Sequence, residues 1–173
     1  TLSASGALDA ESTSFSQRDS DASYDASAAT TIELSGKDAV ITGGGATAAD
    51  GLITITEEGT YIITGSFRGM ITVDAPDDAK LQLVLAGTDI TCANGPALFI
   101  RNADKVFITL AAGSVNTLCD GSSYTALDGD DANADATVFS KADVTINGEG
   151  TLNITGNYKH GIVSKDELNI TGG

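Results

Sequence analysis

The sequence predicts an all-β fold in which the chain winds as a parallel β-helix, a solenoid with coils of about 24 residues and little or no helix. Two observations predict it. Short β-branched runs that end in Gly, Asn or Asp recur from residue 30 onward, and most alternate apolar with polar residues, as strands with one buried face do. Similar segments also recur at a fixed offset. A Greek-key sandwich has short strands too, but it does not account for that repeat.

Residues 1–29 come first and are rich in Ser, Ala and Asp. We expect a linker here, within which Phe15 to Asp25 combines aromatic and charged side chains suited to folding back as a cap. Residues 30–173 are expected to form the β-helix domain, as the N-terminal part of a longer solenoid. Its strands are expected at 31–34, 39–42, 52–56, 60–64, 70–74, 81–85, 97–100, 105–110, 143–147, 151–155, 161–164 and 167–171.

Two pairs of matched segments give the period. SKADVTI at 140–146 recurs 24 residues later as SKDELNI, and AKLQLVL at 79–85 recurs 25 residues later as DKVFITL. A third match joins GTYIITG at 59–65 to GTLNITG at 150–156, which are 91 residues apart, near four periods. Equivalent strands of successive coils pair with one another, so residues one period apart become neighbours. The period therefore stacks Lys141 and Lys165.

The charge balance excludes some partners. The chain has 24 acidic and 9 basic residues and a formal net charge of −15. Nucleic acids and anionic membrane surfaces attract clustered Lys and Arg, so neither is expected as a partner. No stretch approaches the ~18 continuous apolar residues of a membrane span. Such acidity fits a protein that binds cations, or one that its charge keeps soluble.

Two cysteines, Cys92 and Cys119, are 27 residues apart, close to one period. Cysteines on neighbouring coils approach the Cα spacing that a disulfide accepts, so a coil-to-coil disulfide is one interpretation. Two buried free thiols are the other. With a single His and no Cys-x-x-Cys, they do not form a zinc site.

An acidic stretch interrupts the repeat between Cys119 and Phe139. A hard divalent cation with oxygen ligands would remove the repulsion among its carboxylates, so we predict calcium there; a solvated acidic loop is the alternative. The spacing does not match an EF-hand, because Ala132 and Phe139 stand where ligands are required. A site shared with a neighbouring coil remains. The candidate ligands are Asp120, Asp128, Asp130, Asp131, Asp135, Asp143, Asp166 and Glu167.

Stacked Lys141 and Lys165 are unfavourable unless something anionic joins them. One interpretation is a set of salt bridges to Asp143, Asp166 and Glu167. The other is recognition of an acidic ligand, such as a uronic-acid carboxylate bridged by calcium. Further candidate ligand-binding residues are Tyr124 and Tyr158, which can stack on sugar rings, and His160, which we expect in a surface turn. No residue is singled out as catalytic.

Several segments resemble the clostridial β-helix carbohydrate-binding domain family, which was first described as a domain of unknown function and is similar to polysaccharide lyases. The specific ones are LVLAGTDI at 83–90, NADKVFITL at 102–110 and FSKADVTINGEGTL at 139–152. The resemblance implies a right-handed β-helix, secreted or displayed on the cell surface, that binds plant cell-wall polysaccharide, including acidic sugars, with calcium. Ala142 departs from the family's pattern, where a carboxylate is usual, whereas Asp166 and Glu167 retain both acids.

Three functions follow as hypotheses. The first is a carbohydrate-binding module for acidic polysaccharide (polygalacturonate-like) with calcium. The second is a structural subunit of a stalk or filament that self-associates through open solenoid ends. The third is a calcium-dependent polysaccharide lyase with Lys141 or Lys165 as the base.

Overall fold

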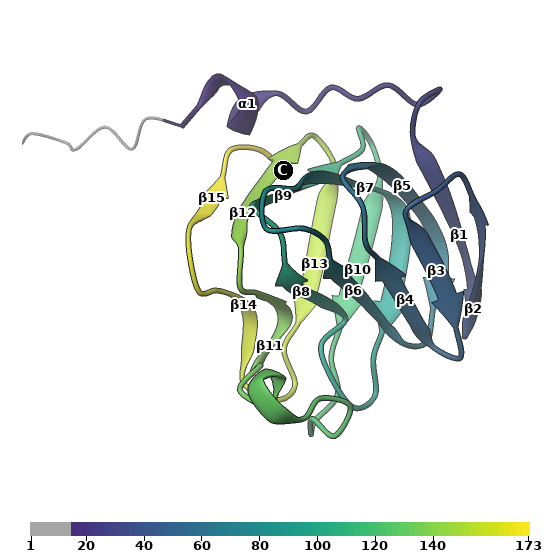
Figure 1. The fold of residues 1–173 in the computed structure, drawn as a ribbon, viewed down its shortest axis with the longest axis vertical. Coiled ribbons are helices and arrows are strands. Elements are labelled where there is room, and N and C mark those ends of the chain that lie inside the picture. Colours follow the sequence, from purple (N-terminus) through teal and green to yellow (C-terminus); the bar gives the residue numbers. More distant parts are fainter. Residues whose placement is uncertain (1–14) are drawn as a thin grey trace, which may run out of the picture.

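The computed structural model describes residues 15–173, and this part of the chain is mostly β, with parallel sheets and almost no helix (Figure 1). The two short helices are α1 (Gln17–Ser20) and the 3-10 turn η1 (Gly129–Asp131). Neither these helices nor any other in the described residues has the length and apolar character to cross a membrane. The strands are β1 (Thr30–Gly36), β2 (Asp38–Thr42), β3 (Ala46–Ala49), β4 (Leu52–Ile55), β5 (Gly59–Phe67), β6 (Met70–Asp74), β7 (Lys80–Thr91), β8 (Leu98–Asn102), β9 (Lys105–Leu110), β10 (Val115–Cys119), β11 (Ala136–Ser140), β12 (Asp143–Gly148), β13 (Thr151–Thr155), β14 (His160–Ser164) and β15 (Leu168–Ile170).

The strands form two sheets. Sheet A runs β15-β12-β9-β7-β5-β1-β2, with β10 attached to β7 and β13 attached to β10. Sheet B runs β14-β11-β8-β6-β4-β3. All pairings are parallel except those of β1 with β2 and of β3 with β4, which add an antiparallel strand to one edge of each sheet. The all-β prediction with parallel pairing is confirmed.

The register agrees with both short-period matches. Ser140 pairs with Ser164, and Lys80 pairs with Lys105. The 91-residue match does not hold, because its two segments lie in different columns of strands: β5 pairs with β1 and β7, whereas β13 pairs with β10. The acidic stretch lies between β10 and β11, and it lengthens one pass of the chain without breaking the register of β11 on β8.

Alternation within the strands produces two apolar cores. Inward-facing Val, Ile and Leu side chains from both sheets fill the main core, and most of them are fully buried. Phe99 of β8 and Phe139 of β11 point the opposite way, because their chain neighbours Leu98, Ile100 and Val138 belong to the main core. The acidic stretch, called here the insertion (residues 120–135), covers these phenylalanines. This second core fixes the insertion on the outer face of sheet B.

The N-terminal segment lies partly inside the described range. Helix α1 begins after Ser16, whose hydroxyl accepts a hydrogen bond from the Asp19 backbone N–H, while the Asp19 carboxylate accepts one from the Ser16 backbone N–H. The helix contacts β12 on the outer side of sheet A. Of the segment predicted as a linker, residues 1–29, the first 14 residues lie outside the described part of the chain.

Both cysteines are free thiols in the structure, so the coil-to-coil disulfide is not formed. The reason is a register difference of one residue. Cys119 pairs with Thr91 rather than with Cys92, and consecutive side chains of a strand point to opposite faces. Cys92 is buried in the second core, where burial raises the pKa of its thiol. The alternative of two free thiols is what the structure shows, although Cys119 is only half-buried.

Candidate functional site

A groove of about 660 Å³ lies where the insertion meets the ends of β11 and β14. It combines residues predicted for two separate roles, metal binding and ligand binding. Its walls are formed by Asp130, Ala132, Asn133, Ala134, Asp135, Phe139, Lys141, Tyr158, Lys159 and Lys165. The structure therefore places the acidic stretch, the stacked lysines and an aromatic side chain around one hollow.

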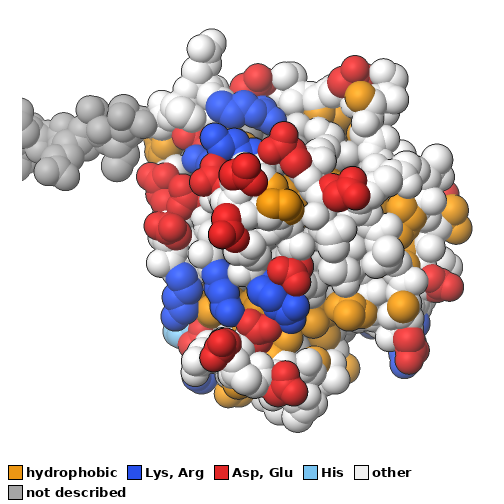
Figure 2. Space-filling view, viewed as in Figure 1, with side chains coloured by type: hydrophobic (Ala, Val, Ile, Leu, Met, Phe, Trp, Pro, Cys, Tyr) orange, Lys and Arg blue, Asp and Glu red, His pale blue; other side chains and the backbone are white. Residues whose placement is uncertain are grey.

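A row of cations follows the ends of three neighbouring strands in sheet B. Ser140 pairs with Ile100 on one side and with Ser164 on the other, so the next residues, Arg101, Lys141 and Lys165, occupy equivalent positions. Figure 2 shows Lys and Arg side chains side by side on this face, with acidic side chains close to them. Sequence reasoning found the two lysines and missed Arg101.

Asp131 of the insertion neutralises part of this row. Its carboxylate lies 2.6 Å from Lys141 Nζ and 2.9 Å from Arg101 Nε. Burial acts to raise the pKa of Asp131, but the hydrogen bond from Lys141 and the charge of Arg101 outweigh it and hold that pKa below its usual value. The predicted salt bridges of Lys141 to Asp143, Asp166 and Glu167 are absent from the described residues, because Lys141 turns to the insertion instead.

Lys165 differs from the other two cations, since it forms no ion pair with any described residue. Its ammonium lies 5.5 Å from the centre of the Phe139 ring, which holds it over the groove wall. Lys165 is exposed. It is the cation of this row that is most available to an anionic ligand.

The two predicted tyrosines form a stacked pair, with ring centroids 4.5 Å apart. Tyr158 is 40% exposed and lines the groove. Tyr124 lies beneath it, and its hydroxyl donates to the Asp120 carboxylate at 2.7 Å. Burial raises the pKa of Tyr124, and so does the neighbouring charge of Asp120. Tyr124 thus supports Tyr158, which is the more exposed ring of the pair and has the Lys159 ammonium 5.2 Å from its centroid.

Asp120 is buried and holds the insertion to the turn after β13. Its carboxylate accepts hydrogen bonds from the Tyr124 hydroxyl and from the backbone N–H groups of Asn157 and Tyr158. Because these donors already use both oxygens, Asp120 acts here as a connector between the insertion and the groove tyrosine.

We expect Asp120→Ala to lower the free energy of unfolding by about 1–3 kcal/mol, since three donors lose their acceptor in a buried place. Urea denaturation measures this, and near-ultraviolet circular dichroism reports the loss of the tyrosine stack. Asp128→Ala is the matched control, because Asp128 is exposed in the same insertion. Equal losses for the two variants would contradict the connecting role of Asp120.

The other predicted metal ligands are dispersed. Asp143 accepts a hydrogen bond from the Glu167 backbone, while Asp166 and Glu167 are exposed and lie outside the groove walls. Within residues 15–173 no three His, Cys, Asp or Glu side chains come together as a metal site. The Oδ1 atom of Asp135 is buried without a hydrogen-bond partner, but one free oxygen does not coordinate calcium, which takes six to eight. The side chains of residues 15–173 alone therefore do not form a calcium cage.

His160 lies at the start of β14 and is exposed. Its Nε2 is 3.9 Å from the Asp135 carboxylate, which Lys159 also approaches at 3.7 Å. His160 is therefore adjacent to the groove wall without being part of it.

Comparisons with known proteins identify a family and a similar solved structure. The sequence profile of a family described as carbohydrate-binding domain-containing protein matches residues 49–173. A protein of that description from Acetivibrio thermocellus is 35% identical over 122 residues, which are 70% of this chain and 43% of the relative. A solved structure, the gadolinium derivative of the polysaccharide lyase-like protein from C. thermocellum, superposes with a TM-score of 0.80 at 32% identity, over 83% of this chain and 59% of the other. The chain thus spans less than two thirds of either.

Proposed function

The chain belongs to the carbohydrate-binding domain-containing protein family, and from that premise we propose that it binds an acidic, polygalacturonate-like polysaccharide in the groove beside the insertion. The family predicted from the sequence is confirmed by the match over residues 49–173. The observation that carries the proposal is the row formed by Arg101, Lys141 and Lys165 next to the exposed ring of Tyr158.

The chemistry of the groove suits such a polymer. Neighbouring strands lie about 4.8 Å apart, so a row of cations at equivalent strand ends meets a ligand that carries a charge on successive units. Lys165 supplies a cation without an ion pair among the described residues, and Tyr158 supplies an apolar face for a sugar ring. The exposed carboxylate of Asp130, which also lines the groove, provides acceptors for sugar hydroxyls. Cation, aromatic ring and acceptors thus surround one hollow.

The proposal also includes a fold in which the chain winds as a right-handed β-helix. The parallel pairing at successive 24- and 25-residue offsets supports coils of a right-handed β-helix, as the family resemblance implies. A rigid stack of this kind keeps the three cations in line. Because cell-wall polysaccharide lies outside the cell, we also propose a secreted or surface-displayed protein.

Isothermal titration calorimetry with polygalacturonate tests the proposal, with a neutral polymer such as dextran as the reference. We expect binding of polygalacturonate that weakens as salt screens the charges, and no binding of dextran. Equal binding of both polymers, or binding of neither, would contradict the proposed ligand class.

Calcium belongs to the proposal as an ion shared with the ligand, since the side chains in the described part of the chain do not enclose one. The exposed Asp128 and Asp130 are carboxylates of the insertion that the ligand's own carboxylates can complement. We expect a chelator to weaken polygalacturonate binding and added calcium to restore it. Binding that a chelator leaves unchanged would remove calcium from the proposal and leave the ligand class intact.

Lyase activity and assembly into filaments remain predictions made from the sequence alone. Lyase activity would be detected as new ultraviolet absorbance from unsaturated products on a uronan. Filament growth would appear as light scattering that rises with protein concentration.

A further inference from the structure

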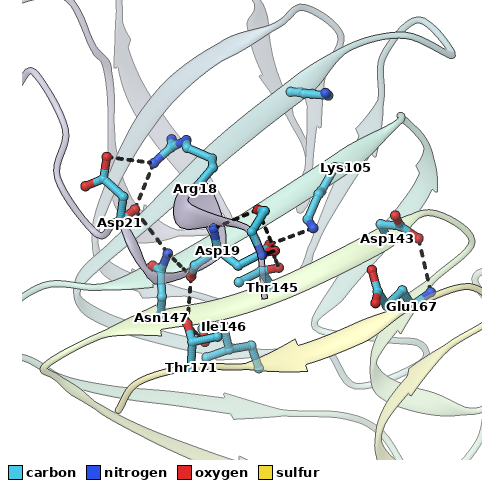
Figure 3. A network of polar contacts seen from close by, with 12 residues as sticks. Arg18, Asp19, Asp21, Lys105, Asp143, Thr145, Ile146, Asn147, Glu167 and Thr171 are labelled. Atoms are coloured by element: carbon cyan, nitrogen blue, oxygen red, sulfur yellow. Dashed lines mark hydrogen bonds and ion pairs between the residues drawn. The ribbon is translucent and has the colours of Figure 1, made fainter. Parts of the chain in front are cut away.

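A second polar surface lies on the outer side of sheet A, away from the groove, and the N-terminal residues cover it. The covering segment, called here the strap, consists of residues 15–25. It crosses β9, β12 and the end of the chain after β15, as Figure 3 shows for Arg18, Asp19 and Asp21. No part of this surface lines the groove.

The carboxylate of one strap residue, Asp19, lies in a buried polar pocket. Asp19 is 3% exposed, and its Oδ1 lies 2.6 Å from Lys105 Nζ and accepts a hydrogen bond from the Thr145 hydroxyl at 2.7 Å. Lys105 and Thr145 are themselves largely buried. Burial acts to raise the pKa of Asp19, but hydrogen bonds from Lys105, Ser16 and Thr145 outweigh it and hold the pKa far below its usual value. The pocket therefore selects a carboxylate.

The rest of the strap is held through its backbone oxygens. The Asn147 side-chain amide donates to the carbonyl oxygens of Asp19 and Asp21, at 3.2 and 3.3 Å. The Thr171 hydroxyl donates to the Asp19 carbonyl at 2.6 Å. The Gln82 amide donates to the carbonyl of Ser23 at 3.2 Å. These contacts recognise a row of acceptor oxygens rather than particular side chains.

The sheet face carries an arrangement that a sugar polymer can use. Gln82, Thr109 and Asn147 form a continuous chain of hydrogen bonds across β7, β9 and β12, at 2.9 and 2.7 Å. The ring of Phe107 lies beside them, with the Arg18 guanidinium 4.6 Å above its centre. A cation, a line of amide and hydroxyl groups and an aromatic ring match the carboxylate, the oxygens and the apolar face of a uronic-acid chain.

The strap is attached by polar contacts and not by the burial of large apolar side chains. Its two aromatic residues, Phe15 and Tyr24, are 45% and 39% exposed, so it buries no large apolar side chain. Its only regular structure is the four-residue α1. Segments with few buried apolar contacts open at a fraction of the global free energy of unfolding. A ligand that offers the same carboxylate and oxygens can therefore replace it.

We infer that the outer face of β7, β9 and β12 is a second binding site for acidic polysaccharide, in which Asp19 of the strap occupies the place of a uronate carboxylate. This inference rests on the proposed function for its ligand class. It adds a site and a competitor: the chain's own N-terminal segment competes with the polymer for Lys105.

The test uses the full chain and a short oligogalacturonate. Asp19→Asn keeps the shape of the side chain but removes the charge that holds Lys105. We expect calorimetry to give a second equivalent of bound oligomer for this variant, where the unchanged protein binds one. In the Asp19→Asn variant, hydrogen exchange of the amides in residues 16–25 should become faster when oligomer is added, because the oligomer displaces the strap.

Two variants control the charge and the site. Asp25→Asn makes the same change in net charge, but Asp25 is exposed and its side chain bonds only within its own turn. This variant should therefore still bind one equivalent of oligomer. Lys105→Gln in the Asp19→Asn background should abolish the second equivalent. Urea denaturation verifies that each variant is folded.

The outcomes separate this inference from the proposed function. Binding of one equivalent by both the unchanged protein and Asp19→Asn, with no change in strap exchange, overturns the second site and leaves the groove in place. A gain in Asp19→Asn that persists after Lys141→Ala and Lys165→Ala supports the second site independently of the groove. No binding by any variant overturns both.

Discussion

Replacing Lys141 and Lys165 together with alanine is expected to weaken polygalacturonate binding about 100-fold. Hydrogen bonds that involve a charged partner contribute about 1.5–3 kcal/mol each when fully formed. Both side chains lie at the surface, so we take the lower end, about 1.4–1.5 kcal/mol per lysine on average, which corresponds to about 100-fold for the pair. Lys165→Ala alone should account for more than half of the free-energy change, because Lys141 is already paired with Asp131.

The control for this prediction is the double variant Lys37→Ala and Arg68→Ala. Both residues are exposed and lie on a different groove, near the ends of β1 and β5, and their loss changes the net charge equally. Calorimetry at one ionic strength compares the two double variants. If both lose affinity to the same extent, the polymer senses only the overall field of the protein, and the groove is not its site.

The sequence predicted the stacking of strands correctly where matched segments fall one period apart. Lys80 with Lys105 and Ser140 with Ser164 are paired as the 25- and 24-residue offsets require. The 91-residue match was wrong. A Gly-Thr motif at the start of a strand favours the same turn and extended backbone wherever it occurs, so similar sequences do not show that two strands stack on one another. Strands β3, β10 and β11 were missed; for β3 the reason is that its residues, Ala46–Ala49, have little β-propensity.

Part of the site was also predictable. Lys141, Lys165 and Tyr158 line one groove together with the insertion. Arg101 could have been found, because Phe99-Ile100-Arg101 reads against Phe139-Ser140-Lys141. The insertion lengthens that interval well beyond one period and conceals the match.

The acidic residues could not be assigned from the sequence, because their partners come from other coils. Asp120 bonds to the turn after β13, and Asp131 pairs with cations at the ends of β8 and β11. Side-chain directions within a long insertion do not follow the period of the strands. The role of Asp19 was hidden for the same reason, since its partners Lys105 and Thr145 are more than 80 residues away in the chain.

The largest loss of stability is expected for Gly148→Ala. Gly148 has a φ of +100°, and a Cβ placed there would overlap the backbone carbonyl of Leu110, its partner in the neighbouring strand. Left-handed backbone costs an L-residue about 1–2 kcal/mol, and overpacking against rigid backbone adds about 1–3 kcal/mol. We therefore expect Gly148→Ala to lower the free energy of unfolding by about 3 kcal/mol or more, as measured by urea denaturation.

Gly113→Ala is the matched control, because Gly113 also has a positive φ, +71°, but a Cβ there would meet no atom within 4 Å. Both variants force alanine into a backbone conformation with positive φ, but only in Gly148→Ala does the added Cβ overlap the neighbouring strand. The difference between their stabilities therefore measures how closely β12 lies on β9. Equal losses would mean that these strands do not pack in the register described here. The alignment of Arg101, Lys141 and Lys165 depends on the same coil-on-coil register, so the proposed binding row would then lose its geometric basis.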